Sequence, residues 1–375
     1  MAHIEFNHVT KHYGDVVAVR DVTITVEDNE FFCFFGPPSS GKTTLLRLLL
    51  GLEKPTEGEI RIDGRPVNAL TPAARNLAMV FQNLALFPHM SARENLRFPL
   101  VERGVAATLI ENRLAEVAAK LHIVHLLDKH PAHLSGGERQ RVAIGRALMR
   151  DAAAYLMDDP ISALDARLRE EMRVELKRLQ RDIGHTFVYV THDQEEAMSV
   201  ADRMAILEHG MLRQVDAPEV IYDRPSSRYV ASIIGSPQMN FVPGEIDGAT
   251  GEFRSDDGDL KLSLSGCRDR PTVSVELGFR PEDAELAGGG GGMQGRVISV
   301  EPLGAFSIVV VSSTSRLLKA MLKGQRAPAV GEIVSVGVSP SRVALFRRDD
   351  GRRLEVGARR AEDKRERTVE ETQTG

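Results

Sequence analysis

The sequence contains few cysteines, no long hydrophobic run and no large excess of charge of one sign. Only two of its 375 residues are cysteine, Cys33 and Cys267, which excludes a disulfide framework and a cysteine-ligated zinc site and fits a reducing compartment. Cys33 lies in the apolar run Phe31–Phe35 and is expected to be a small buried residue. The formal net charge of −5 provides no overall attraction to nucleic acid, so we expect no nucleic-acid partner.

The sequence also lacks a membrane-spanning segment. No stretch approaches the roughly 18 uninterrupted apolar residues that a span requires. The longest apolar run, Leu45–Leu50, contains Arg47. The first residues, Met1-Ala2-His3-Ile4-Glu5, lack the basic and apolar regions of a signal peptide. We therefore expect a soluble protein that reaches a membrane only through a partner.

Length and patterning predict an α/β domain, a small all-β barrel and a charged tail. The chain is too long for one average domain. Residues 1–235 alternate strand-like and helix-like patterns, whereas residues 236–348 contain short β-rich runs between turn residues, which predicts a barrel of five to eight strands. Within it, Gly288–Gly292 is expected to be a flexible loop. Residues 349–375 carry few large apolar side chains and are expected to be disordered.

Hydrophobic spacing predicts individual elements of the first domain. Val22, Ile24 and Val26 alternate with other residues, so we expect a strand with these three side chains on its buried face. The further predictions are a buried strand at 31–35, a helix at 45–50 that ends at Gly51, helical segments at 107–130 and 166–182, and a helix start at Asp165.

A phosphate-binding loop follows the predicted buried strand. The segment Gly36-Pro37-Pro38-Ser39-Ser40-Gly41-Lys42-Thr43, followed by Thr44, matches the pattern G-x-x-x-x-G-K-[ST] between an apolar strand and an apolar helix. Backbone N–H groups of such a loop bind phosphate oxygens at the helix start. Lys42 is expected between the β- and γ-phosphates, and the Thr43 hydroxyl on Mg²⁺. Alone, the loop also fits kinases, GTPases and helicases, and the alternative without a ligand is a tight turn.

A second motif resembles the signature of one ATPase family. The segment Leu134-Ser135-Gly136-Gly137-Glu138-Arg139-Gln140-Arg141 resembles the signature sequence of ABC ATPases. The resemblance implies that Ser135, Gly136 and Gly137 open a helix and bind the γ-phosphate of ATP held by the other subunit of a dimer. The alternative is an N-capped amphipathic helix without a ligand.

Further motifs occur in the order that the family has. Tyr155-Leu156-Met157-Asp158 resembles a Walker B strand, in which Asp158 would hold Mg²⁺ through water. Ser162–Asp165 resembles the D-loop, which links the two active sites, and His192 resembles the switch residue that touches the γ-phosphate. Gln82 resembles the Q-loop glutamine that contacts Mg²⁺ and the attacking water, and Tyr13 the aromatic residue that stacks on adenine. Outside this family, each of the last three residues would be read as structural.

The resemblance extends to the importer branch that includes ATPases for maltose and glycerol 3-phosphate. It rests on four segments, 221–225, 235–241, 278–282 and 301–304. It implies a moving helical subdomain at about 85–155, an OB-like regulatory barrel, two permease subunits, a second ATPase subunit, a periplasmic solute-binding protein, and a place on the cytoplasmic face of the bacterial inner membrane. ATPases for polyamines, sulfate and ferric iron share this layout, but Met239-Asn240-Phe241 favours a sugar, polyol, glycerol or glycerol phosphate.

Two departures from the family pattern predict a slow ATP site. Asp159 stands where the family has the glutamate that polarises the hydrolytic water, so its carboxylate reaches about 1 Å less far. Pro38 and Ser39 replace the usual serine and glycine; Pro38 offers no N–H donor, and Ser39 tolerates a positive φ poorly. We hypothesise that the chain pairs with a different ATPase subunit whose site is completed by this chain's signature. A homodimer with two modest sites is the alternative.

Other ABC or P-loop proteins fit the sequence less well. Non-transport ABC ATPases usually carry a coiled-coil insertion or a second ATPase domain. The distance from Gln82 to Ser135 leaves no room for a coiled coil, and the sequence contains only one set of motifs. Small-molecule kinases and GTPases lack the signature segment. An exporter ATPase is disfavoured by the C-terminal barrel and by the lack of spanning segments.

Overall fold

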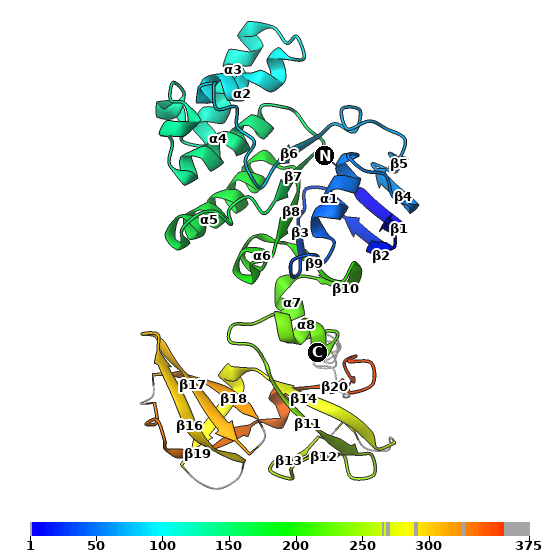
Figure 1. The fold of residues 1–375 in the computed structure, drawn as a ribbon, viewed down its shortest axis with the longest axis vertical. Helices are drawn as coiled ribbons and strands as arrows, with labels where there is room; N and C mark the ends of the chain where they lie inside the picture. Colours follow the sequence, from blue (N-terminus) through cyan, green and yellow to red (C-terminus); the bar gives the residue numbers. More distant parts are fainter. Residues whose placement is uncertain are drawn as a thin grey trace, which may run out of the picture. The chain divides into compact units, whose positions relative to one another are not determined.

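The chain folds as two compact units, residues 1–223 and 224–375 (Figure 1). The computed structural model describes residues 2–264, 266–267, 271–288, 292–314, 316–324 and 327–355. Among these residues no helix combines the length and the apolar character needed to cross a membrane. The boundaries predicted at residues 235 and 348 for the functional domains stay predictions.

The first unit contains two β-sheets. An antiparallel sheet has the order β2-β1-β4-β5, and a six-stranded sheet has the order β10-β9-β3-β8-β7-β6. Within the second sheet β9, β3, β8, β7 and β6 are parallel, and β10 pairs antiparallel with β9 at the edge. The strands are β1 Ile4–Tyr13, β2 Val16–Val26, β3 Phe31–Phe35, β4 Glu57–Ile62, β5 Arg65–Pro66, β6 Leu77–Val80, β7 Ala154–Asp158, β8 Thr186–Thr191, β9 Arg203–Glu208 and β10 Met211–Asp216.

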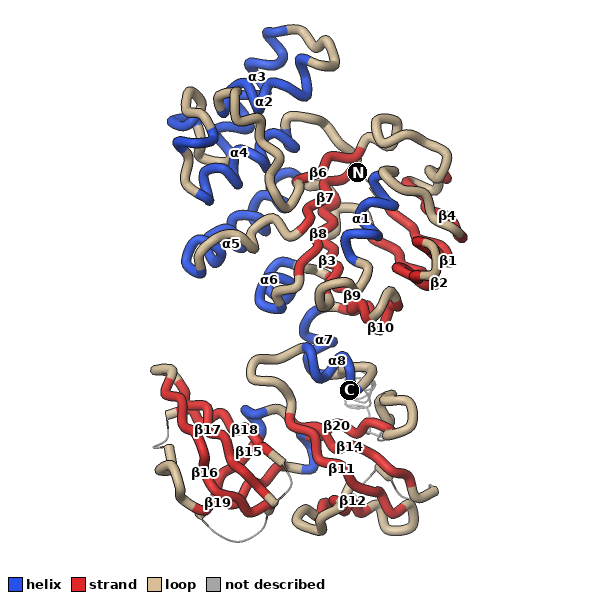
Figure 2. The backbone as a smooth tube through the Cα atoms, viewed as in Figure 1, coloured by secondary structure: helices blue, strands red, loops and turns tan. Residues whose placement is uncertain are grey.

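The helices of this unit largely follow the sequence predictions. They are α1 Lys42–Leu50, α2 Ala92–Val101, α3 Ala107–Lys120, α4 Gly136–Leu148, α5 Ala166–Ile183, α6 Gln194–Val200 and α7 Pro218–Asp223, coloured blue in Figure 2. Gly51 ends α1 at φ 83°, and the Asp165 side chain caps α5 by accepting the Leu168 N–H. The helix predicted at 107–130 is too long, because the chain turns at His122, whose φ of 56° leaves the right-handed helical region.

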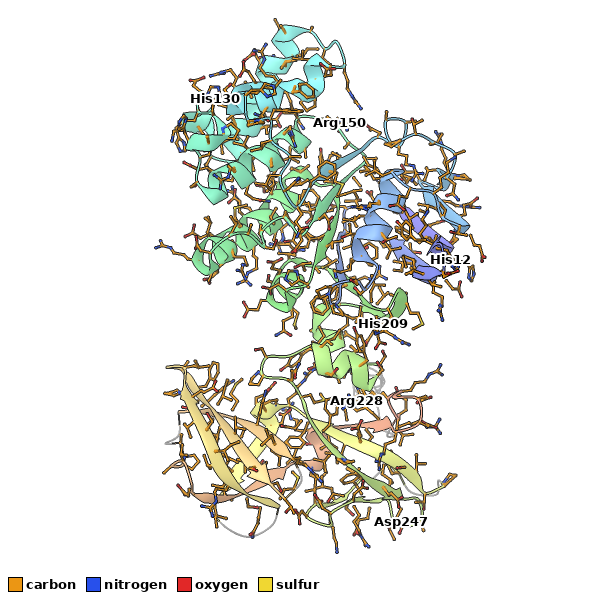
Figure 3. The ribbon with its side chains drawn as sticks, in the orientation of Figure 1. His12, His130, Arg150, His209, Arg228 and Asp247 are labelled. Carbon is orange, nitrogen blue, oxygen red and sulfur yellow. The ribbon has the colours of Figure 1, made fainter. Side chains whose placement is uncertain are left out.

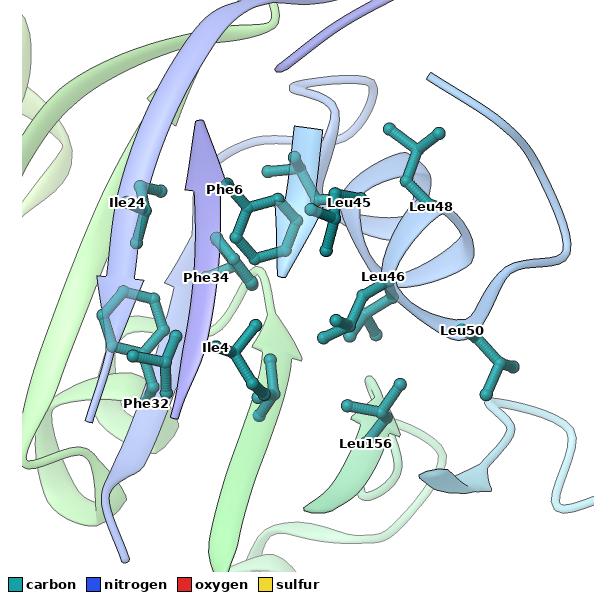
Figure 4. Packing of buried hydrophobic residues seen from close by; sticks show 14 of the residues in the cluster. Ile4, Phe6, Ile24, Phe32, Phe34, Leu45, Leu46, Leu48, Leu50 and Leu156 are labelled. Carbon is teal, nitrogen blue, oxygen red and sulfur yellow. The ribbon is translucent and has the colours of Figure 1, made fainter. Parts of the chain in front are cut away.

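The core of the first unit fixes α1 against both sheets. Leu45 and Leu46 of α1 face Ile4 and Phe6 of β1 (Figure 4), and all four side chains are fully buried. The Phe6 and Phe34 rings pack edge to face, with centroids 6.1 Å apart. As predicted, β3 is buried at every residue, Cys33 included, and Val22, Ile24 and Val26 form the buried face of β2. This packing anchors the two elements, β3 and α1, between which the loop runs.

The strand order explains why distant motifs meet. In the parallel sheet β8 lies between β3 and β7, with Phe35 opposite Thr191 and Asp158 opposite Val190. The carboxyl ends of the three strands therefore share one edge of the sheet, where ligands of α/β proteins bind. The phosphate loop, the Walker B carboxylate and the switch histidine follow these three strand ends.

The described residues of the second unit form an all-β structure with one α-helix, α8 Arg228–Ile233, and the short 3₁₀ helices Pro281–Asp283 and Pro340–Arg342. Its strands form two five-stranded antiparallel sheets, β13-β12-β11-β14-β20 and β15-β19-β16-β17-β18, over one shared core, so the expected five to eight strands is too few. The strands are β11 Asn240–Asp247, β12 Glu252–Ser255, β13 Lys261–Ser263, β14 Val273–Phe279, β15 Ala284–Ala287, β16 Met293–Pro302, β17 Phe306–Ser313, β18 Leu317–Lys323, β19 Ile333–Val338 and β20 Val343–Arg347. Most of the predicted glycine loop, and residues 356–375 of the predicted tail, lie outside the described residues.

The Met239-Asn240-Phe241 segment has a structural role within this unit. The Asn240 amide donates to the Lys319 carbonyl oxygen at 2.8 Å, and the Lys319 N–H donates to Asn240 Oδ1 at 2.8 Å. Met239 and Phe241 pack with Phe346. The segment that favoured a solute class therefore joins β11 to β18 and contributes to the packing of the barrel.

Candidate functional site

The phosphate loop surrounds a cavity of about 460 Å³. Its lining comes from Val16–Ala18 of β2, Ser39–Thr44 and His209, which lies in the turn between β9 and β10 (Figure 3). The Lys42 ammonium donates to the carbonyl oxygens of Gly36 and Pro37, both at 2.8 Å. Burial lowers the pKa of Lys42, opposed by the carboxylates of Asp159 and Asp158. A buried cation at a helix N-terminus is a strong binding point for a polyphosphate.

The backbone of the loop shows the strain that the sequence predicts at Ser39. Ser39 adopts φ 63°, a left-handed conformation that costs a serine on the order of 1 kcal/mol. Gly41 lies at φ 100°, and a Cβ there would come within 2.7 Å of the Ala18 carbonyl oxygen, so this position requires glycine. The departure at Ser39 is therefore tolerated by the fold at an energetic cost, whereas Gly41 is fixed by sterics.

Thr43 and Asp158 form the part of the site suited to a divalent cation. The Thr43 hydroxyl donates to Asp158 Oδ1 at 3.1 Å, so both oxygens converge beside the loop. Burial raises the pKa of Asp158, and the Thr43 hydrogen bond opposes that rise. Among the described residues no group of three or more His, Cys, Asp or Glu side chains could hold a metal alone. One carboxylate and one hydroxyl fit Mg²⁺, which usually takes its remaining ligands from phosphates and water.

Asp159 lies at the centre of a second cluster. Its Oδ2 is 3.0 Å from Nδ1 of His192 and 3.5 Å from Nε2 of Gln82. Its Oδ1 is 3.4 Å from the Thr191 hydroxyl. Asp159 is 7% exposed, and its φ is 48°. The structure thus brings the Q-loop, the Walker B end and the switch to one carboxylate.

Tyr13 is the last residue of β1. A short turn connects it to β2, whose first residues, Val16–Ala18, line the cavity. Its hydroxyl donates to the Glu53 carboxylate, and Lys11 Nζ lies 4.9 Å from its ring centroid. Burial, followed by the bond to Glu53, raises the pKa of Tyr13 to about 12. The ring is 44% exposed and remains neutral at physiological pH, so one face is accessible to a purine.

The signature residues lie at the start of α4. Ser135 Oγ accepts the Glu138 N–H at 3.3 Å, and the Ser135 N–H donates to Glu138 Oε2 at 2.6 Å, which forms a capping box. A Cβ on Gly137 would lie 2.7 Å from the Leu168 side chain, so this glycine allows α4 to approach α5. Among the described residues, Ser135, Gly136 and Gly137 make no hydrogen bond to the phosphate loop of their own chain.

Sequence reasoning missed two side chains that hold these motifs in place. Arg169 of α5 donates to the Leu164 carbonyl oxygen of the D-loop at 3.1 Å and to Asp193 Oδ2 at 3.2 Å. Glu196 of α6 is 1% exposed and accepts a hydrogen bond from the Thr191 hydroxyl at 2.7 Å. For Arg169, the sequence offered one indication, since an arginine four residues after Asp165 lies one helical turn from the D-loop. Nothing distinguishes Glu196 from its exposed neighbour Glu195 in the sequence.

Comparisons with known proteins identify the family. Residues 19–162 match the family described as ABC transporter, 235–284 the MalK OB fold domain and 277–346 the TOBE domain. Over 353 residues the chain is 42% identical to the sulfoquinovosyl glycerol transport ATP-binding protein SmoE of Agrobacterium fabrum, covering 92% of this chain and 98% of that protein. The chain belongs to the ABC transporter ATP-binding proteins. The ABC fold class and the resemblance drawn from the motifs are confirmed.

Further relatives agree with this assignment. This ABC transporter ATPase is 47% identical over 315 residues to the sn-glycerol-3-phosphate import ATP-binding protein UgpC of Rhizobium meliloti, covering 82% of this chain and 87% of that one. The ADP- and Pi-bound dimer of the ATP-binding cassette MJ0796 is 31% identical, with a TM-score of 0.52, over 57% of this chain and 98% of that one. The chain is therefore an ATPase subunit that couples hydrolysis to transport, and kinases, GTPases and non-transport ABC proteins are set aside.

Proposed function

We propose that this ABC ATPase powers uptake of a sugar, polyol, glycerol or glycerol phosphate. The proposal is supported by the names of the relatives, which include sn-glycerol-3-phosphate import and sulfoquinovosyl glycerol transport proteins matched over most of the chain. Importers of polyamines, sulfate or ferric iron are the alternative. In this function the chain acts on the cytoplasmic face of the bacterial inner membrane, and a periplasmic binding protein selects the solute.

ATP binds between two ATPase subunits in the proposed cycle. The loop from Gly36 to Thr44 wraps the phosphates, with Lys42 between the β- and γ-phosphates and Tyr13 against the adenine. Ser135, Gly136 and Gly137 of the facing subunit present the N-terminus of α4 to the γ-phosphate. This role is supported by the absence, among the described residues, of hydrogen bonds from these three to their own phosphate loop. Closing of the dimer moves residues 85–155 and the attached permeases.

Mg²⁺ would be held by the Thr43 hydroxyl, by Asp158 through water and by Gln82. When bound, this cation neutralises charge on the phosphates. Asp159 orients and polarises the attacking water, and His192, whose Nδ1 lies 3.0 Å from Asp159 Oδ2, contacts the γ-phosphate. Because aspartate is one methylene shorter than glutamate, the water lies farther from the base, and turnover is slow. We infer that the native dimer contains a second, faster ATPase whose site this chain's signature completes.

An apolar groove beside the Q-loop is the docking place for a permease. The groove has a volume of about 490 Å³ and a mainly apolar lining that includes Ala73, Met79, Phe81, Phe87 and Phe98. Three arginines, Arg103, Arg146 and Arg150, also line it. Arg146 of α4 shapes it by donating to the carbonyl oxygens of Leu84 at 2.9 Å and Ala85 at 2.6 Å. A short amphipathic helix of a membrane subunit fits such a groove. Because the groove adjoins Gln82, movement at the ATP site reaches the permease directly.

The observation that carries the ATPase part of the proposal is the meeting of Lys42, Thr43, Asp158, Asp159 and His192 at the ends of β3, β7 and β8. The test is uptake of labelled glycerol 3-phosphate, glycerol, a panel of sugars and polyols, and sulfate by cells with and without the gene. Loss of uptake of one of the first three, restored by the wild-type gene, supports the proposal. Loss confined to sulfate would overturn the solute class.

A further inference from the structure

Behind Asp159 lies a buried chain of hydroxyl and carboxyl groups that the motifs do not describe. Thr191 Oγ1 is 3.4 Å from Asp159 Oδ1 and 2.7 Å from Glu196 Oε2. The Tyr189 hydroxyl donates to the same Glu196 oxygen at 3.0 Å. Tyr189 and Thr191 are fully buried and Glu196 is 1% exposed. A carboxyl group of α6 is thereby connected to the hydrolytic carboxylate through one hydroxyl.

The Thr191 hydroxyl has a single proton for two acidic neighbours. It also accepts the Asp193 N–H at 3.0 Å, so its proton can point only toward Glu196 or toward Asp159. If Glu196 is ionised, the proton goes to the closer oxygen of Glu196, and Asp159 Oδ1 faces a lone pair. If Glu196 is neutral, Glu196 donates to Thr191 and Thr191 donates to Asp159. Only in the second arrangement does Asp159 Oδ1 accept a hydrogen bond from the Thr191 hydroxyl.

The surroundings favour the neutral form of Glu196. Its Oε1 has no hydrogen-bond partner among the described residues, which a buried carboxylate tolerates worse than a carboxylic acid does. The acidic groups near it are Asp159, Asp193 and the Cys33 thiol of β3, and the nearby cations Arg169 and Arg173 pair with Asp193 and Glu195. Burial raises the pKa of Glu196, and the bonds from Thr191 and Tyr189 oppose that rise.

We propose that Glu196 is a positioning residue for ATP hydrolysis, acting as a neutral acid that turns the Thr191 proton toward Asp159. This inference rests on the proposed role of Asp159. An aspartate reaches less far than a glutamate, so its orientation matters more, and a hydrogen bond to Oδ1 keeps Oδ2 toward Gln82 and His192. Hydrolysis then slows as pH rises and Glu196 ionises, although ATP binding is unchanged.

The test compares Glu196→Gln with Glu195→Gln in the full chain with Mg-ATP. Glu195 is the matched control, because it lies next in α6 with its side chain 70% exposed. A glutamine at 196 donates to Thr191 at every pH, so we expect its kcat to lose the alkaline fall of the wild type, with KM unchanged. Glu196→Ala should lower kcat about tenfold through a mispositioned Asp159. Superimposable pH profiles for wild type and Glu196→Gln would overturn the proposal.

An infrared measurement gives an answer that does not depend on turnover. The wild-type protein should show the carbonyl band of a protonated carboxylic acid at neutral pH, and Glu196→Gln should lose it. A wild-type spectrum unchanged by Glu196→Gln contradicts a neutral Glu196. Failure of the proposed ATPase function would appear differently, as lack of ATP binding by the wild type. If wild-type turnover is slow, the same pH comparison is made by single-turnover phosphate release with the protein in excess over ATP, so that Asp159 is kept in every variant.

Discussion

The Nδ1 atom of His192 lies 3.0 Å from Oδ2 of Asp159, so the switch residue and the residue after Walker B meet within one subunit. The contact follows from the parallel order of β7 and β8, which places Asp158 opposite Val190. Gln82 approaches the same oxygen from the Q-loop at 3.5 Å. Any change in the length of the side chain at 159 therefore alters three motifs together.

Replacing Asp159 by glutamate should speed hydrolysis. The added methylene carries the carboxylate about 1 Å farther toward the water, so kcat of the purified chain should rise on the order of tenfold or more. Steady-state phosphate release measures this kcat. Asp151→Glu is the control, since that side chain is 95% exposed. A wild-type chain that is already fast, and that Asp159→Glu leaves unimproved, argues against a weak site.

Lys42→Ala should abolish hydrolysis without unfolding the chain. The variant removes the buried ammonium from the phosphate cavity, so kcat should fall by at least about 100-fold. Lys54→Ala, at an exposed position, should behave as wild type. Calorimetric ATP binding and thermal unfolding separate the two effects. Tight ATP binding by Lys42→Ala would contradict the assigned role.

Gly137→Ala should destabilise the junction of α4 and α5. The new methyl group meets the Leu168 side chain at 2.7 Å, which should cost about 1–3 kcal/mol of unfolding free energy. Adding Leu168→Ala should recover part of that loss by making room. Gly288→Ala, where a Cβ meets nothing within 4 Å, is the control. Urea unfolding gives the free energy of unfolding of the wild type, Gly137→Ala, the double variant with Leu168→Ala, and Gly288→Ala. Equal stability of Gly137→Ala and wild type would show that this glycine has no packing role.

Ala73→Glu should weaken assembly with the permeases. The substitution places a charge in the apolar groove, whereas Ala74→Glu places the same charge on the neighbouring exposed residue outside the lining. Co-purification with the membrane subunits should fall for the first variant and not for the second. ATP binding should be the same in both. Equal co-purification of both variants would remove the groove as a docking site.

Arg203→Met should make stability more sensitive to a rise in pH from 5 to 8. Burial raises the pKa of Glu30, and Arg203, at 3.3 Å, opposes the rise. A raised pKa means that Glu30 binds its proton more tightly in the folded state than in the unfolded state. The folded state therefore loses stability as pH rises through the folded-state pKa of Glu30. Without Arg203 the loss should be steeper, on the order of 1–3 kcal/mol, with solvent screening at the partly exposed Arg203 keeping it modest. Urea unfolding at pH 5 and pH 8 measures the difference. Parallel pH dependences for variant and wild type would contradict it.

The sequence predicted local elements around the candidate site well where one motif follows one strand. The phosphate loop, the Walker B strand and the helix cap at Asp165 depend on neighbouring residues, and the structure has these elements where they were expected. The strained φ at Ser39 was also foreseeable, because the loop geometry requires a left-handed residue there.

Features that depend on packing between distant segments were not predictable. Glu195 and Glu196 are adjacent and chemically alike, yet one is exposed and the other is buried against β8, because the rotation of α6 is fixed by its contacts. The length of the helix from residue 107 was overestimated because its apolar spacing continues past the turn at His122. Asn240 bonds the backbone of Lys319, a pairing that spans 79 residues.

The most direct test of the account asks whether one ATP site is built from two chains. Lys42→Ala and Ser135→Arg are each made in the Asp159→Glu background, and phosphate release is measured for each variant alone and for an equal mixture. Each alone should be inactive, and random pairing should restore about one quarter of the background rate, because half of the dimers contain one intact site of two. An equal mixture as inactive as its components, beside an active Asp159→Glu control, would contradict a nucleotide shared between subunits.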